Sequence, residues 1–151
     1  MTAADDIAMR RALALAAEAA AVHEIPVGAV VLDAAGRIVA EGRNDREATH
    51  DPTGHAEIAA LRAAAASAGS WNLDGHTLVV TLEPCIMCAG AILQARIGRV
   101  VFGAWDEKAG AAGSMYDVLR DRRLPYRAEV VGGVSADAAT ALLRDFFESR
   151  R

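Results

Sequence analysis

The segment TLEPCIMCAG, residues 81–90, contains the only two cysteines of the chain, Cys85 and Cys88. A C-x-x-C pair can serve as a redox dithiol, as two inert buried thiols or as part of a metal site. A position at the start of a helix favours the thiolate form, which suits both redox chemistry and metal binding. Taken alone, the pair leaves all three alternatives open.

A second segment, HAE at residues 55–57, adds a donor of the kind that zinc prefers. Both segments follow a loop or a strand and are expected to begin a helix, so the two helix N-termini can meet at one end of a sheet. His55, Cys85 and Cys88 would then hold one zinc ion and leave its fourth position open to water. An open position is typical of catalytic zinc, and the sequence has no third cysteine to close the site.

Glu57 would give such a site its chemistry, because a carboxylate beside zinc-activated water can accept and return a proton. Residues i and i+2 of a regular helix point about 200° apart. Both side chains can therefore reach one water only if His55 lies at the cap or in the first turn, which the preceding DPTG segment favours. The plain alternative for Glu57 is a first-turn acid that interacts with the helix dipole.

The surrounding pattern predicts an α/β fold, a three-layer α/β/α sandwich around a five-stranded mixed sheet. We expect one domain over residues 1–151. Residues 45–54 are expected to form a polar loop. The predicted strands cover residues 27–33, 37–44, 77–81, 99–104 and 128–134, and the predicted helices begin near Asp5, His55, Pro84 and Ser135, with Ser135 as a side-chain cap.

Composition limits the class of partner and the compartment. A formal net charge of −4 argues against indiscriminate binding to polyanions, and the arginines of residues 120–127 are expected to be solvated. Two neighbouring cysteines cannot build a disulfide framework, which favours a cytoplasmic protein. The segment after Arg10 resembles a secretion signal, but Glu18 interrupts it. No stretch approaches the roughly 20 apolar residues of a membrane span, so no membrane is expected.

HAE followed by PCIMC matches the H-x-E…P-C-x-x-C signature of zinc-dependent nucleobase deaminases. The signature alone does not separate deaminases of cytosine, cytidine, guanine or adenosine. Further segments extend the match over nearly the whole chain, which resembles the family of bacterial tRNA-specific adenosine deaminases (TadA). These segments are IPVGAV (25–30), HDPTGHAEI (50–58), TLEPCIMCAGAI (81–92), RIGRVVFGA (96–104), GAAGS (110–114) and LLRDFF (142–147).

The resemblance implies a cytidine deaminase-like fold and hydrolytic deamination of adenosine to inosine at the wobble position of tRNA. It implies one Zn²⁺ per chain, held by His55, Cys85 and Cys88, which activates the water that attacks C6 of adenine. Glu57 would shuttle the proton of that water. The implied partners are a tRNA anticodon stem-loop and a second copy of the chain in a homodimer, and no DNA partner is expected.

The resemblance also implies substrate contacts. Asn44 matches a base-contacting asparagine, Val27 an apolar residue of the base pocket, and Asp106 an aspartate near a ribose 2′-hydroxyl. Phe147 lies with Phe146 on the last helix, near the substrate entrance of the family. At least one of the two phenylalanines is expected to pack in the core.

Three residues depart from the pattern of the family. Arg43 replaces a frequent Trp, Gly54 replaces the usual Ala, and Trp105 replaces a frequent Arg in the RNA-facing loop. The last change exchanges a phosphate-binding charge for a stacking surface. These departures concern RNA contacts and leave the predicted zinc ligands untouched.

Three other functions stay open. A deaminase of a free base or nucleoside (cytosine, guanine or adenosine) would use the same centre. A zinc-stabilised RNA-binding module would not need Glu57 for its function. A dithiol oxidoreductase would hold no metal.

Overall fold

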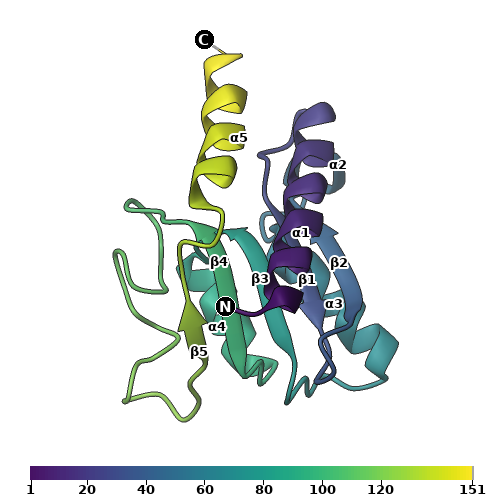
Figure 1. Cartoon of the computed structure of the whole chain (residues 1–151), viewed down its shortest axis with the longest axis vertical. Helices are drawn as coiled ribbons and strands as arrows, with labels where there is room; N and C mark the ends of the chain where they lie inside the picture. The colour runs from purple at the N-terminus through teal and green to yellow at the C-terminus, as the bar shows by residue number, and fades with distance from the viewer. Residues whose placement is uncertain (151) are drawn as a thin grey trace.

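The computed structural model describes residues 1–150 and contains one five-stranded mixed sheet in the order β2-β1-β3-β4-β5 (Figure 1). β1 pairs antiparallel with β2 and with β3, and β4 and β5 continue the sheet parallel to β3. The predicted strands, including the hairpin, are confirmed. The strands are β1 (Gly28–Leu32), β2 (Ile38–Arg43), β3 (Thr77–Leu82), β4 (Arg99–Ala104) and β5 (Glu129–Val131).

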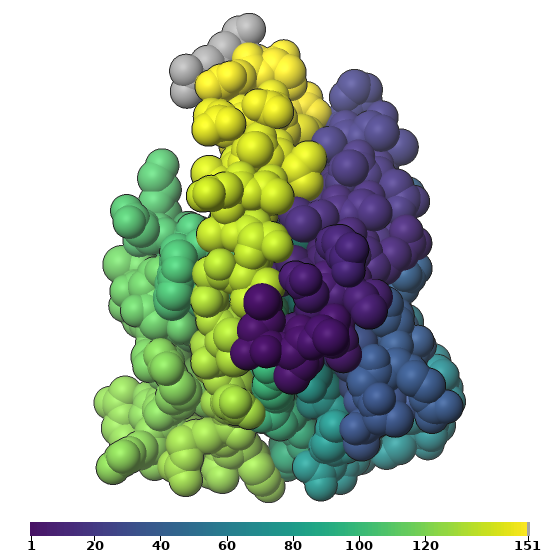
Figure 2. Space-filling model, in the orientation of Figure 1, coloured from purple at the N-terminus to yellow at the C-terminus, as the bar shows by residue number. Residues whose placement is uncertain are grey.

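Helices cover both faces of the sheet, which confirms the three-layer sandwich. α1 and α5 lie side by side over one face, and α3 and α4 cover the other (Figures 1 and 2). No helix within residues 1–150 combines the length and the apolar character needed to cross a bilayer. The helices are α1 (Ala3–Ala21), α2 (Arg46–Thr49), α3 (Ala56–Ala68), α4 (Ile86–Gln94) and α5 (Ala136–Glu148).

β1 shows why a central strand of this sheet consists of apolar residues without alternation. All five of its residues are buried, because helices cover both faces. Ala29 and Val31 belong to the core beneath α3 and α4, whereas Val30 and Leu32 belong to the core beneath α1. The two-residue period of a strand thus places alternate side chains in two separate cores.

The structure corrects the sequence-based elements in three places. Residues predicted as a polar loop contain the short helix α2, whose Glu47 and Ala48 N–H groups donate to the buried carboxylate of Glu24 at 3.1 and 2.8 Å. Ser135 precedes α5, but it adopts a left-handed conformation with φ 55° and its side chain makes no capping hydrogen bond. The predicted Ser135 cap is therefore wrong. β5 is also shorter than predicted, because it ends at Val131.

A buried ion pair joins the first turn of α1 to the start of β4. The Arg99 guanidinium donates to both carboxylate oxygens of Asp5, at 2.7 and 2.6 Å. Asp5 is buried, and it also completes a capping box with Thr2. The hydrogen bonds from Arg99 lower the pKa of Asp5 to about 2.

We predict that Asp5→Asn lowers the free energy of unfolding by about 3 kcal/mol at pH 7, because it removes the buried carboxylate that Arg99 binds and leaves Arg99 only its 3.7 Å contact with the exposed Glu129. The depressed pKa of Asp5 means that its contribution is complete above about pH 4 and declines as the pH falls towards 2. Urea unfolding at pH 7 and pH 3 should therefore show a smaller difference from the wild type at pH 3. Asp6→Asn, at an exposed position of the same turn, is the control. An equal loss in both variants would contradict the prediction.

Candidate active site

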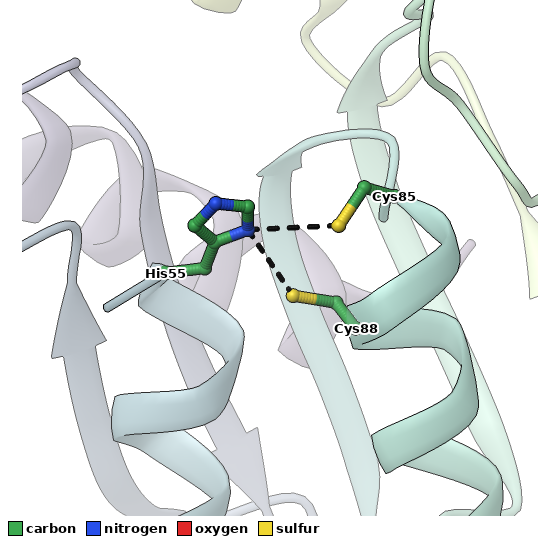
Figure 3. A group of neighbouring side chains, drawn as sticks. All are labelled: His55, Cys85 and Cys88. Atoms are coloured by element: carbon green, nitrogen blue, oxygen red, sulfur yellow. Dashed lines mark hydrogen bonds between the residues drawn. The ribbon is translucent and has the colours of Figure 1, made fainter. Parts of the chain in front are cut away.

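Three predicted zinc ligands converge where two helices begin. His55 is the N-cap of α3, Cys85 is the N-cap of α4, and Cys88 lies in the first turn of α4. The His55 Nδ1 atom is 3.6 Å from the Cys85 sulfur and 3.4 Å from the Cys88 sulfur. Figure 3 shows both sulfurs directed at this nitrogen from the neighbouring helix.

The donor separations fit a tetrahedral zinc ion. Bond lengths of about 2.0–2.1 Å to nitrogen and about 2.3 Å to sulfur place tetrahedral N and S ligands roughly 3.5 Å apart. The observed N···S distances of 3.6 and 3.4 Å agree with this separation, which identifies Nδ1 as the coordinating nitrogen. Within residues 1–150, no other group of three such donors lies close enough to hold an ion. The chain thus provides one zinc site, with three protein ligands and one position left for a non-protein ligand.

The backbone at His55 explains how residues 55 and 57 serve the same site. His55 is extended, with φ −88° and ψ 153°, and regular helix begins only at Ala56. The separation of about 200° between positions i and i+2 of a helix therefore does not apply to His55 and Glu57. The expected position of His55 at the helix cap is confirmed.

Helix α4 begins in a similar way, but the predicted position of Pro84 in its first turn is wrong. Cys85 is extended, with φ −75° and ψ 175°, and α4 begins at Ile86. Pro84 therefore precedes the N-cap and does not lie in the first helical turn. Its carbonyl accepts a hydrogen bond of 2.7 Å from the N–H of Ala111, which connects the cysteine segment to a distant loop.

The ionisable groups of the site perturb one another strongly. Burial raises the pKa of Glu57, which is 4% exposed, to about 7. A hydrogen bond from the Cys88 thiol lowers the pKa of Cys85 to about 4, and the same bond, together with burial, raises the pKa of Cys88. The protein alone thus leaves one proton on the sulfur pair. A divalent cation stabilises both thiolates and displaces that proton.

A cavity of about 150 Å³ lies beside the zinc ligands. Drug-sized ligands occupy pockets of about 300–1,000 Å³, so this cavity suits a single small ring system. Apolar side chains and a few polar groups share its surface, which is typical of a site that orients a flat, partly polar ligand. The residues beyond the zinc ligands are Ile25, Val27, Asn44, Arg46, Ala56, Glu57, Leu82, Glu83, Asp106 and Ala109.

Three of the four predicted substrate contacts reach this cavity. Asn44, Val27 and Asp106 line it, and the first two are almost fully buried. Phe147 is 49% exposed on α5 and does not line it. Phe146 is the buried member of the pair and packs edgewise on Phe147, as expected for one core phenylalanine. A substrate role of Phe147 stays a prediction.

Two residues that line the cavity have no role in the sequence-based prediction. Arg46 belongs to α2, which the polar composition of residues 45–54 did not reveal. Glu83 is buried, and it accepts hydrogen bonds from the backbone of Asp106 and from Ser114. Burial by itself raises the pKa of Glu83, but these hydrogen bonds outweigh it, so the pKa is lowered. The only sequence signal for Glu83 was its place in the motif.

The three departures from the family pattern do not line the cavity, but each directly precedes in the chain a residue that does. Arg43 ends β2 and forms a 3.8 Å ion pair with a glutamate of α1. A side chain at Gly54 would place Cβ 2.8 Å from the Cα of Arg46, so this loop conformation requires glycine. Trp105 is half exposed and packs edgewise on Phe102, with a ring separation of 4.7 Å.

Comparison with known proteins defines the family. Residues 2–104 match the family described as "Cytidine and deoxycytidylate deaminase zinc-binding region". The match covers all three zinc ligands, Glu57 and the sheet as far as β4. The chain belongs to this family of zinc-binding deaminases.

Several relatives are close over nearly the whole chain. A tRNA-specific adenosine deaminase of Haemophilus influenzae is 50% identical over 97% of this chain and 85% of its own length. A tRNA(Ile)-lysidine synthase of Deinococcus deserti is 53% identical over 97% of this chain. The chain spans only about a quarter of the length of that relative and of its counterpart in Deinococcus radiodurans.

Solved structures agree on the fold. A structure from studies of A-to-I editing by tRNA:A34 deaminases at the wobble position of transfer RNA is 38% identical, with a TM-score of 0.87. The match covers 91% of this chain and 99% of that one. A guanine deaminase from Nitrosomonas europaea is 27% identical with a TM-score of 0.81, over 93% of this chain and 83% of its own.

We predict that the purified protein carries one zinc ion per chain and that Cys88→Ser or His55→Ala removes most of it, because two ligands bind zinc far more weakly than three. Metal content is measured by mass spectrometry after dialysis. His50→Asn is the control, because His50 lies in the same region, outside the donor group, and asparagine tolerates its left-handed conformation. Full zinc content in either ligand variant would contradict the assignment.

Proposed function

We propose that this chain hydrolyses adenosine to inosine at the wobble position of a tRNA anticodon. The observation that carries the proposal is the open His/Cys/Cys centre with the buried Glu57 beside a cavity of single-base size. The 50% identity to a tRNA-specific adenosine deaminase and the 0.87 TM-score to a structure from work on wobble editing support the tRNA substrate.

Glu57 is the proton carrier of the proposed reaction. A zinc ion bound by the three ligands supplies Lewis-acid activation of the attacking water. The Glu57 carboxylate accepts a proton from the attacking water and delivers it to the adenine ring. It then takes the remaining proton of the hydroxyl group added at C6 and passes it to the amino group, which leaves as ammonia. Its burial supports this role, because few solvent molecules compete for the proton.

Asn44 and Val27 orient the base in our proposal. The Asn44 amide can donate a hydrogen bond to the polar edge of the adenine and accept one from it. Asn44 is 6% exposed and lines the cavity. Val27 offers an apolar surface to the face of the ring. Such a small enclosed cavity accepts only a base that has left its stack, which suits an unpaired anticodon nucleotide.

Asp106 provides the contact to ribose. Its Oδ1 atom accepts the N–H groups of Lys108 and Ala109 at 3.1 Å, so its carboxylate has a fixed orientation at the cavity. A carboxylate oxygen here can accept a hydrogen bond from the 2′-hydroxyl group, which distinguishes RNA from DNA. This contact supports RNA over DNA as the substrate.

A deaminase of a free base or nucleoside is the second candidate. The fold shared with a guanine deaminase, at a TM-score of 0.81, favours it. Ammonia release from guanine, cytosine or adenosine without RNA would support this candidate, and inosine formation only in an anticodon stem-loop would exclude it.

A homodimer and a cytoplasmic location are further parts of the proposal. An apolar groove runs along the outer side of α3 and α4, and Trp71 beside it is 63% exposed. Exposed apolar surface of this kind supports contact with a second chain. A dimer would also let two modest RNA-contacting surfaces act together.

We predict that the protein forms inosine in an anticodon stem-loop with adenosine at the wobble position. We further predict that Glu57→Gln lowers kcat by about 10²–10⁴-fold, because it removes the proton carrier. The variant should keep one zinc ion per chain. Inosine is measured by mass spectrometry of digested RNA. The absence of inosine in a zinc-loaded wild type would refute the tRNA substrate, and full activity in Glu57→Gln would refute the mechanism.

We predict that Trp71→Glu converts a dimer into a monomer, because a charge in an apolar interface is poorly solvated. Sedimentation velocity measures the mass of the wild type and the variant at the same concentration. Arg10→Glu changes an exposed residue of α1 away from the groove and is the control. A wild type that sediments as a monomer would contradict the proposed dimer.

A further inference from the structure

Glu83 is a buried carboxylate whose partners all lie in one distant segment. The segment is residues 105–114, named here the 105–114 loop, which follows β4. Glu83 accepts the backbone N–H groups of Asp106, Ala112 and Ser114 at 2.9, 3.0 and 3.0 Å, and also the hydroxyl of Ser114. One side chain therefore holds the loop at its beginning and at its end.

The charge of Glu83 is compensated by hydrogen bonds alone. A buried charge usually requires either an ion pair or several strong hydrogen bonds. Within residues 1–150, Glu83 forms no ion pair. A loop that moved away would leave a buried carboxylate with unsatisfied acceptors. Glu83 therefore favours the one loop conformation that directs these N–H groups inward.

The 105–114 loop is also fastened to the cysteine segment itself. Ala111 donates to the carbonyl of Pro84 at 2.7 Å, and Gly110 forms a bridge with Cys85. A side chain at Gly110 would collide with the Glu83 carboxylate, so the two residues are in direct contact. The loop in turn contributes Asp106 to the cavity wall. The contacts thus connect a zinc ligand to a wall of the substrate cavity.

We propose that Glu83 is a positioning residue that holds the 105–114 loop against the zinc-binding turn and thereby sets the affinity for the nucleotide carrying the target base. The inference rests on the proposed function and deepens it, because it assigns substrate affinity to a buried group that need not touch the RNA. Glu83 acts through Asp106 and its neighbours, while Glu57 moves the proton.

The test begins with Glu83→Gln, which keeps size and shape. The amide of glutamine directs N–H donors at the N–H donors of the loop, so at least one hydrogen bond is lost. We expect KM for the anticodon stem-loop to rise about tenfold, by the usual cost of an unsatisfied buried group. We expect kcat to change by less than about threefold and zinc to stay at one per chain, since no ligand is altered.

A direct readout of the loop does not depend on activity. Hydrogen exchange should accelerate in Glu83→Gln at one or more of the amides of Asp106, Ala112 and Ser114, because glutamine replaces one of the two acceptor oxygens by an NH2 group. Ser114→Ala removes only the hydroxyl donor and should show a smaller effect, with KM raised by about threefold. If Glu83→Gln does not fold, Ser114→Ala replaces it as the test variant. Glu129→Gln, at an exposed position of β5, is the matched control and should leave KM and loop exchange unchanged.

The outcomes separate this inference from the proposed function. Unchanged KM and unchanged loop exchange in Glu83→Gln, or in Ser114→Ala alone if the first variant is unfolded, would overturn the positioning role. A fall in kcat with unchanged KM would also overturn it, because Glu83 would then act on the chemical step. A zinc-loaded wild type that forms no inosine would refute the proposed function, and hydrogen exchange in the same variants would still decide whether Glu83 holds the loop.

Discussion

The extended backbone at two helix N-caps is the constraint on which the active site depends. His55 and Cys85 both stand just outside regular helix, so their side chains turn towards each other across the end of the sheet. In a continuous helix, His55 and Glu57 would point about 200° apart and could not serve one reaction centre. The same arrangement places Cys88, in the first turn of α4, within 3.4 Å of the histidine nitrogen. Two helix starts thus bring together the three zinc ligands and Glu57, the proton carrier of our proposal.

The molecule divides metal binding and substrate binding between two kinds of structure. The zinc ligands lie at the N-terminal ends of α3 and α4, which pack on a sheet covered on both faces, whereas much of the cavity wall comes from short or irregular segments. Two buried carboxylates hold those segments by backbone N–H groups: Glu24 holds α2, and Glu83 holds the 105–114 loop. Departures from the family pattern, such as Gly54 and Trp105, also lie in the irregular segments. The zinc chemistry can therefore be retained while contacts to the substrate vary.

Local patterns predicted the zinc ligands and the sheet, but they could not predict contacts made by distant residues. The zinc ligands could be predicted from the short-range H-x-E and P-C-x-x-C spacings. The strands could be predicted from their runs of β-branched residues. α2 was missed because its four residues depend on Glu24, more than 20 positions earlier in the chain. The predicted Ser135 cap is wrong because the left-handed backbone at Ser135 turns the side chain away from the helix N-terminus. The sequence could not decide which phenylalanine of the last helix packs in the core, and the helix phase directs Phe146 there and leaves Phe147 exposed.

The most direct test of the open zinc centre is X-ray absorption at the zinc edge of the purified protein. We predict two sulfur neighbours at about 2.3 Å and two light-atom neighbours at about 2.0–2.1 Å. One light atom should belong to the imidazole of His55 and the other to an exchangeable solvent ligand that a small anion can displace. Two imidazole signals, or a first shell without sulfur, would contradict a three-ligand site with a position open for catalysis.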